Sequence, residues 1–116
     1  MAQFALLLPH TPGRYDGLDQ EAYMAIIKDY IAWVEKLTAD GVYQGGHKLV
    51  SEPGRVLAAR NGTVEVHDSP LAEVTEILGG IMLITADDYD QAVEIARGHP
   101  HLKHNNRIEI RKVDGV

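Results

Sequence analysis

The chain has 116 residues, of which 45% are hydrophobic and 24% charged, as in an ordinary globular domain with one core. Lys and Arg number 11 against 17 Asp and Glu, so the net charge is -6, and because the basic residues form no stripe we expect no nucleic-acid partner. Cysteine is absent, which excludes disulfides, thiolate metal sites and cysteine nucleophiles.

The first third of the chain predicts a strand and a long helix. Residues 4–8 form a short continuous apolar run that Pro9 ends, which is typical of a strand buried on both faces. Turn residues occupy 10–17. Asp19 can cap a helix whose apolar residues recur at helical spacing until Gly41, so we expect one face of this helix to pack on a core.

The middle of the chain predicts a strand within residues 42–50 and then a β-hairpin. Asn61-Gly62 strongly indicates the hairpin, because a type I′ turn needs positive φ at both central residues. Residues 55–60 and 63–66 supply its two strands.

The last third predicts a buried strand over 79–85, a helix capped by Asp87 or Asp88, and a final strand over 108–113. Together the elements give one domain over residues 1–116. Its fold class is α+β, a ferredoxin-like βαββαβ arrangement with an extra β-hairpin.

The apolar pattern of the strands also predicts a second copy of the chain. Two helices cover only one face of a four-stranded sheet, whereas residues 4–8 and 81–84 are apolar on both faces. Another copy of the same sheet is the simplest cover for the second face. We therefore expect a homodimer, built as a dimeric α/β barrel.

Five segments, together with the acidic start of the second predicted helix, resemble one protein family. The central segment, Val66-His67-Asp68-Ser69-Pro70-Leu71-Ala72-Glu73, is similar to the Asp-Gly-Pro-Phe-Ala-Glu signature of the YCII-related (DGPF-domain) family. The other segments are Leu6-Leu7-Leu8, Gly45-Gly46-x-x-Leu49, Glu76-x-Leu78-Gly79-Gly80 and Ile108-Glu109-Ile110-Arg111. The chain departs from the family pattern at Ser69, Leu71 and Lys112, where the family has Gly, Phe and often Pro.

This resemblance implies a dimeric α+β barrel, related in fold to muconolactone isomerases and to cofactor-independent monooxygenases of small aromatic compounds. Most members of the family have no established activity. In the wider superfamily a His and an Asp are proposed as an active-site pair, and some members are encoded beside, or fused to, sigma factors of the extracytoplasmic type.

Asp68 and His47 are the first candidates for acid/base chemistry. Asp68 follows the hairpin, where its carboxylate can reach the barrel mouth as a general base or orient a histidine. Its alternative role is an Asx turn or helix cap. His47 follows Gly45-Gly46, which leave room for a ligand, and its ordinary pKa near 6.5 suits proton transfer. The alternative for His47 is a solvated position on an edge strand.

Glu73 is the third candidate. On a helical turn Glu73 and Glu76 would share a face and form a paired carboxylate, whereas the alternative is a solvated turn before the strand that begins at Gly79.

The histidines near the second helix raise the question of a metal site. His99, His101 and His104 are close in sequence, but their spacing matches no metal motif and Pro100 breaks the helix that would align them. The alternative to a metal site is that these histidines lie at the end of the second helix and interact favourably with its dipole. His101 can also line a cavity. We therefore assign no metal and no cofactor.

Aromatic residues on the long helix have a simpler interpretation. Tyr23, Tyr30 and Trp33 follow helical spacing, which favours a core or interface over a substrate platform. The sequence cannot orient Tyr43, which can face a pocket.

These observations favour a small-molecule pocket in which Asp68 and His47 act as acid and base and Glu73 supports them. The expected chemistry is proton transfer, isomerisation or cofactor-free oxidation of a small compound. The alternative is a non-catalytic module for ligand sensing or protein interaction beside a transcription system.

No apolar run approaches the roughly 20 residues of a membrane span, and the first residues lack a signal-peptide pattern, so we expect a cytoplasmic protein with a small-molecule partner and no membrane partner.

Overall fold

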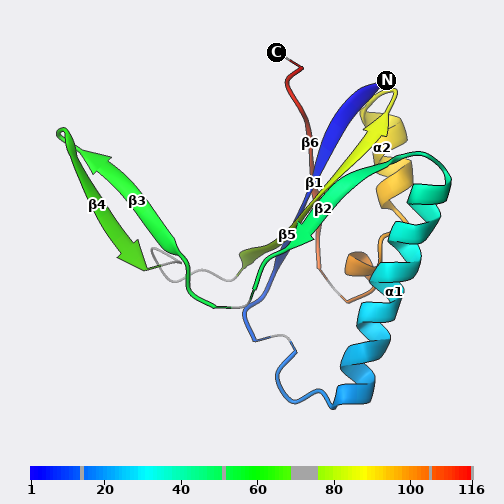
Figure 1. Ribbon diagram of the computed structural model, residues 1–116, viewed down its shortest axis with the longest axis horizontal. Helices are drawn as coiled ribbons and strands as arrows, with labels where there is room; N and C mark the ends of the chain where they lie inside the picture. Colours follow the sequence, from blue (N-terminus) through cyan, green and yellow to red (C-terminus); the bar gives the residue numbers. More distant parts are fainter. Residues whose placement is uncertain (14, 51, 69–75, 105, 116) are drawn as a thin grey trace.

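Four strands form an antiparallel sheet with two helices on one face, and a separate hairpin projects away from it (Figure 1). The computed structural model describes residues 1–13, 15–50, 52–68, 76–104 and 106–115. The elements are β1 (Ala2–His10), α1 (Gln20–Ala39), β2 (Tyr43–Lys48), β3 (Arg55–Arg60), β4 (Thr63–Asp68), β5 (Ile77–Ala86), α2 (Tyr89–Ala96), the 3-10 helix η1 (Pro100–His104) and β6 (Glu109–Lys112). The sheet order β2-β5-β1-β6 is ferredoxin-like, which confirms the predicted α+β class; within one chain the sheet is open and forms no closed barrel.

Both helices begin at the predicted aspartates. The side chain of Asp19 accepts the backbone N–H of Ala22 at 2.7 Å, and that of Asp88 accepts the N–H of Gln91 at 2.8 Å. Each carboxylate satisfies a backbone donor that the helix itself leaves unpaired, so these caps fix where each helix starts.

The core lies between the sheet and the helices. Alternate residues of β1 point to this side, and Phe4 and Leu6 are fully buried. They pack in one cluster with Trp33 and Leu37 of α1 and with small residues of α2. Burying each large side chain contributes about 1.5–3 kcal/mol, so this face holds the helices on the sheet.

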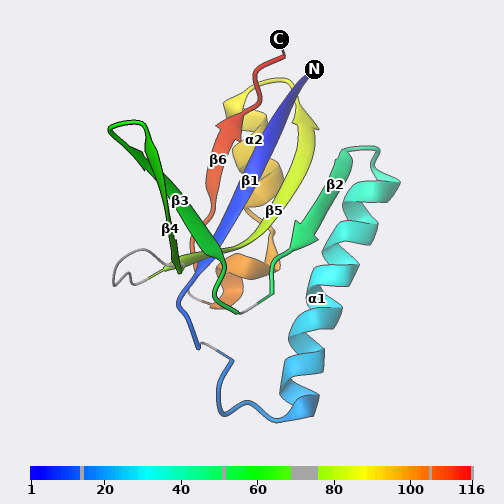
Figure 2. The same ribbon diagram turned by 60° about the vertical axis from the view of Figure 1, so that its left-hand side comes forward.

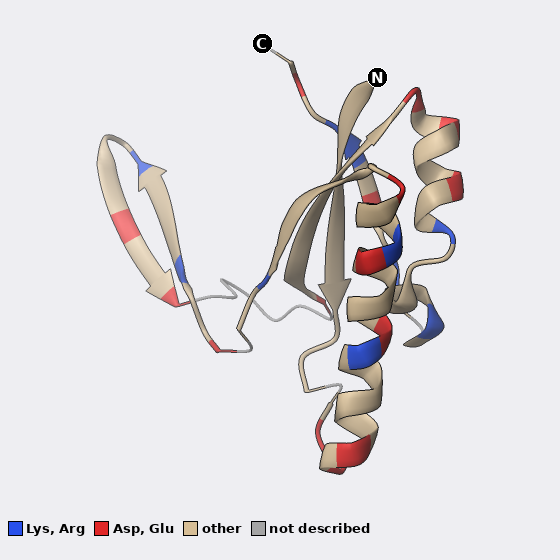
Figure 3. Ribbon diagram, turned by 45° about the vertical axis from the view of Figure 1, so that its right-hand side comes forward, with Lys and Arg blue, Asp and Glu red and all other residues tan. Residues whose placement is uncertain are grey.

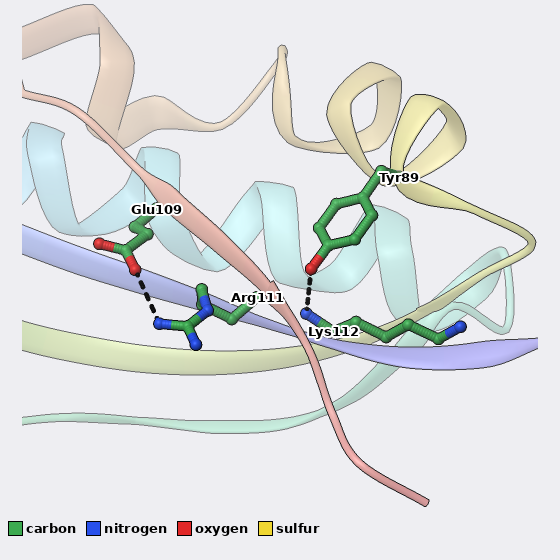
Figure 4. Close-up of polar contacts among 4 residues, drawn as sticks. All are labelled: Tyr89, Glu109, Arg111 and Lys112. Atoms are coloured by element: carbon green, nitrogen blue, oxygen red, sulfur yellow. Dashed lines mark hydrogen bonds and ion pairs between the residues drawn. The ribbon is translucent and has the colours of Figure 1, made fainter.

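Tyr89 ties α2 to the last strand (Figure 4). Its ring packs edge-on against Phe4 with centroids 4.9 Å apart, and its hydroxyl accepts the backbone N–H of Lys112 at 2.8 Å. The ion pair of Glu109 with Arg111 on β6 spans 3.3 Å between exposed side chains, and a pair of this kind adds little stability.

The other face of the sheet is apolar and has no helix over it among the described residues. Ala5 pairs with Leu83 and Leu7 with Ile81, and all four side chains point away from the helices and are half-buried. In Figure 2 the hairpin lies on this same side of the sheet. The described residues therefore leave this apolar sheet face only partly covered.

The predicted hairpin is confirmed as β3 and β4. Asn61 and Gly62 have φ values of 50° and 80°, as a type I′ turn requires. One face of the hairpin exposes Leu57, Val64 and Val66, with 66%, 60% and 63% of their surfaces accessible. The projecting arm helps to give the chain a radius of gyration of 16.3 Å, against about 13 Å for a compact chain of about 100 residues.

Charged residues lie mainly on the helices, the loops and the hairpin, with both signs intermixed (Figure 3). None of the described helices is both long enough and apolar enough to cross a membrane. The cytoplasmic location stays a prediction.

Candidate functional site

A cavity of about 260 Å³ opens between the sheet, α1 and η1. Its lining side chains are mostly apolar, with a few polar groups among them, which is the usual make-up of a small-molecule pocket. The lining residues are Leu8, His10, Tyr15, Ile27, Tyr30, Ile31, Tyr43, Gly46, His47, Lys48, Gly79, Gly80, Met82 and His101.

His10 enters this cavity because β1 continues beyond the predicted end at Pro9. The β1–β5 register shifts between Leu8 and Pro9, and proline is tolerated at such a bulge because it has no N–H to pair. The ring of His10 is only 8% exposed, and its Nδ1 lies 3.0 Å from the carbonyl oxygen of Thr11. A carbonyl can only accept, so Nδ1 carries a proton, and in the neutral ring Nε2 keeps its lone pair. Among the described residues, Nε2 of His10 has no hydrogen-bond partner.

Gly79 makes the space that His10 occupies. It has no Cα partner on β1 at the register shift. A Cβ added at Gly79 would lie 2.1 Å from Cδ2 and 2.7 Å from Nε2 of His10, distances that no side chain tolerates. Gly80 is less crowded than Gly79, because a Cβ added at Gly80 would meet no atom closer than 3.3 Å.

Tyr30 and His101 form a second polar pair at the cavity. Nε2 of His101 lies 2.6 Å from the carbonyl oxygen of Pro9, so it donates to that oxygen, and Nδ1 accepts the hydroxyl of Tyr30 at 2.9 Å. The tyrosine that the sequence assigned to a core or interface therefore lines the cavity instead. His101 is 2% exposed and meets the prediction that it can line a cavity.

His99 contacts both members of this pair, Tyr30 through its ring and His101 through its backbone. It is 1% exposed, its Nδ1 accepts the backbone N–H of His101 at 2.9 Å, and its ring lies 4.2 Å from that of Trp33. Burial, and then the charge of His101, lower the pKa of His99 to about 4. At neutral pH the His99 ring is therefore uncharged and holds the start of η1 in place.

The histidines are not arranged as a metal centre in the described part of the chain. Across residues 1–13, 15–50, 52–68, 76–104 and 106–115, no three His, Asp or Glu side chains are grouped to hold a metal ion.

The structure separates the three predicted acid/base candidates. His47 lines the cavity. Asp68 ends β4 with its side chain 82% exposed, paired with Arg55 at 3.4 Å, and is not among the residues that line the cavity. Glu73 lies outside the described residues. His47 is exposed on the edge strand β2 and pairs with Ile81, whose side chain points away from the helices. Catalytic roles for these three residues stay predictions, and His10, Tyr30 and His101 also line the cavity.

His10 was not predicted, although the sequence carries an indication of it. The alternation of Phe4, Leu6 and Leu8 continues to His10 if the strand is allowed to pass Pro9. Ending the strand at Pro9, as the sequence predicts, places His10 in a loop instead.

Comparison with known proteins agrees with the resemblance seen in the sequence. The family model of the YCII-related domain matches residues 2–114, which is nearly the whole chain. The chain belongs to the YCII-related family. No curated protein matches this YCII-related sequence.

Among solved structures, the YCII-related chain is similar to 5-chloro-2-hydroxyhydroquinone dehydrochlorinase from Burkholderia phenoliruptrix, in complex with 2,5-dihydroxybenzoquinone. The TM-score is 0.54 and the sequence identity 17%, with 97% of this chain and 93% of that chain covered. The two proteins therefore share a fold over almost their whole length.

Proposed function

We propose that this YCII-related protein is an enzyme that transfers protons on a small ring compound held in the cavity. One observation carries the proposal: His10, whose Nε2 has no hydrogen-bond partner among the described residues, lines a mostly apolar cavity together with Tyr30. A base and a hydrogen-bond donor at one cavity are the minimum that an enolisation requires.

The chemistry follows from the protons on these groups. His10 Nε2 accepts a proton from a carbon next to a carbonyl, and the negative charge moves to the carbonyl oxygen. The Tyr30 hydroxyl turns from Nδ1 of His101 and donates a hydrogen bond to that oxygen. Protonated His10 then returns the proton to the same carbon or to another one, which completes an exchange or an isomerisation.

The size of the cavity supports a ligand with one ring. A cavity of about 150 Å³ is sufficient to bind benzene, so about 260 Å³ leaves room for one or two substituents. The dehydrochlorinase of similar fold holds a substituted quinone ring. We therefore choose 2,5-dihydroxybenzoquinone as the first ligand to test, followed by single-ring ketones and lactones.

His10→Gln tests the proposal directly. The protein is incubated with these ring compounds in deuterated water, and the exchange of their acidic C–H groups is followed by NMR. We expect His10→Gln to slow the exchange about 100-fold or more, because a positioned base contributes about that much. His67→Gln, on the hairpin, is the matched control and should leave the rate unchanged.

Two results would contradict the proposal. One is an exchange rate that His10→Gln leaves intact. The other is binding of a ring compound without any proton exchange, which would favour the ligand-sensing module that the sequence left open.

We also propose that the working form is a homodimer. The apolar face around Leu7 and Leu83 and the exposed hairpin residues support it, because a monomer would leave both in water. Leu83→Glu should shift the sedimentation coefficient from that of a dimer to that of a monomer. Val93→Glu, on the outer surface of α2, should not. A wild-type protein that sediments as a monomer at micromolar concentration would exclude this dimer.

A further inference from the structure

The charges of the cavity differ from those of the whole chain. The chain carries six more acidic than basic residues. No Asp or Glu occurs among the described residues that line the cavity, which instead include Lys48, three histidines and three tyrosines. β1 and β5 contain no Lys, Arg, Asp or Glu, and Lys48 is the one such residue of β2. The cavity is therefore a neutral to positive site in an acidic protein.

Among the described residues, Lys48 is held by the aromatic side chains of Tyr15 and Tyr23. Its Nζ donates to the hydroxyl of Tyr23 at 2.8 Å and lies 5.3 Å and 5.9 Å from the ring centroids of Tyr23 and Tyr15. The two tyrosine rings pack edge to face with centroids 5.4 Å apart. No ion pair of Lys48 occurs among residues 1–13, 15–50, 52–68, 76–104 and 106–115. These contacts orient the ammonium group, and none of the described residues supplies a counter-ion for its charge.

We infer that the cavity selects small ring compounds that carry an anionic oxygen, and that Lys48 is the residue that binds this oxygen. The inference rests on the proposed function, because it names the substrate class of the same cavity. The apolar side chains of Leu8, Ile27 and Met82 provide a surface for the ring. Lys48 can then add a charge-assisted hydrogen bond to a carboxylate, phenolate or enolate at the edge of that ring.

The charge of Lys48 also fits the chemistry of an enolisation. An enolate or phenolate carries its negative charge on oxygen, and an ammonium group stabilises that charge more than it stabilises the neutral ketone. The same residue would therefore select anionic ligands and favour the charged intermediate.

The test compares a charged and a neutral probe of nearly the same shape. Dissociation constants of benzoate and benzamide are measured by isothermal titration calorimetry at about pH 8, where unperturbed imidazoles are neutral and lysine is charged. A second pair, 4-nitrophenolate and 4-nitroanisole, asks whether a phenolate is bound as well as a carboxylate.

We expect the wild-type protein to bind at least one anion about tenfold more tightly than its neutral counterpart. Lys48→Met should remove this preference without weakening the neutral probe, and Lys48→Arg should retain most of it. Lys36→Met, on the exposed surface of α1, removes the same charge away from the cavity and should change neither constant.

Other outcomes separate this inference from the proposed function. Equal binding of anion and neutral probe, or an equal loss of both in Lys48→Met, would overturn the role of Lys48 and leave a ring-binding cavity in place. Failure of all four probes to bind at millimolar concentration would overturn both.

Discussion

Replacing Gly79 with alanine should destabilise the protein by about 1–3 kcal/mol and expel His10 from the cavity. The new Cβ would lie 2.1 Å from Cδ2 of the His10 ring and 3.3 Å from the carbonyl oxygen of Leu8. The ring has to move away from Gly79, so the variant loses the packing of His10 against Gly79 and the position of the proposed base. Urea denaturation measures the stability, and the NMR exchange rate measures the loss of the base.

A second substitution shows whether the clash with the His10 ring causes the loss of stability in Gly79→Ala. His10→Ala removes the ring, so Gly79→Ala should cost much less in the His10→Ala background than in the wild type. Gly80→Ala is the matched control, because its Cβ would meet the nearest atom at 3.3 Å. Equal losses of stability from Gly79→Ala in both backgrounds would show that the strain lies in the backbone.

Lowering the pH from about 6.5 to about 4 should destabilise this protein through His99. Its pKa is lowered from 6.5 to about 4 in the folded chain, by burial first and by the charge of His101 second. Between these two values the unfolded chain binds a proton that the folded chain does not. Stability from this group is therefore complete above about pH 6.5 and falls as the pH drops toward about 4, by about 3 kcal/mol in total.

The difference between variants isolates this effect from the titration of carboxylates. Urea unfolding is measured over a series of pH values for the wild type and for His99→Gln, which can still accept the N–H of His101 but does not titrate. We expect a shallower loss of stability in His99→Gln over this range. His67→Gln, on the hairpin, should keep the wild-type slope, and parallel curves for wild type and His99→Gln would rule out His99 as the cause.

Local chemistry explains why most of the fold was predictable. A cap such as Asp19 or Asp88 and a turn such as Asn61-Gly62 depend on contacts within a few residues, which the sequence displays directly. The strand order then follows from the alternation of helices and strands.

The candidate site was harder to predict because distant segments build it. The acceptor for His101 is the carbonyl group of Pro9, and its donor is Tyr30 on a helix near the other end of the chain. No local pattern orients these groups. The central motif predicts Asp68 as an acid/base residue, whereas the structure places Asp68 at the end of the hairpin in an exposed ion pair.

The hydrogen bond between His101 and the carbonyl group of Pro9 also links the two ends of the chain. His101 and the carbonyl group of Pro9 are 92 residues apart in sequence, so their hydrogen bond closes almost the whole chain into a loop. The entropy of loop closure opposes such a contact, so this hydrogen bond depends on the rest of the fold to hold its two ends together. A chain truncated before η1 lacks His101 and therefore cannot assemble the Tyr30 and His101 pair.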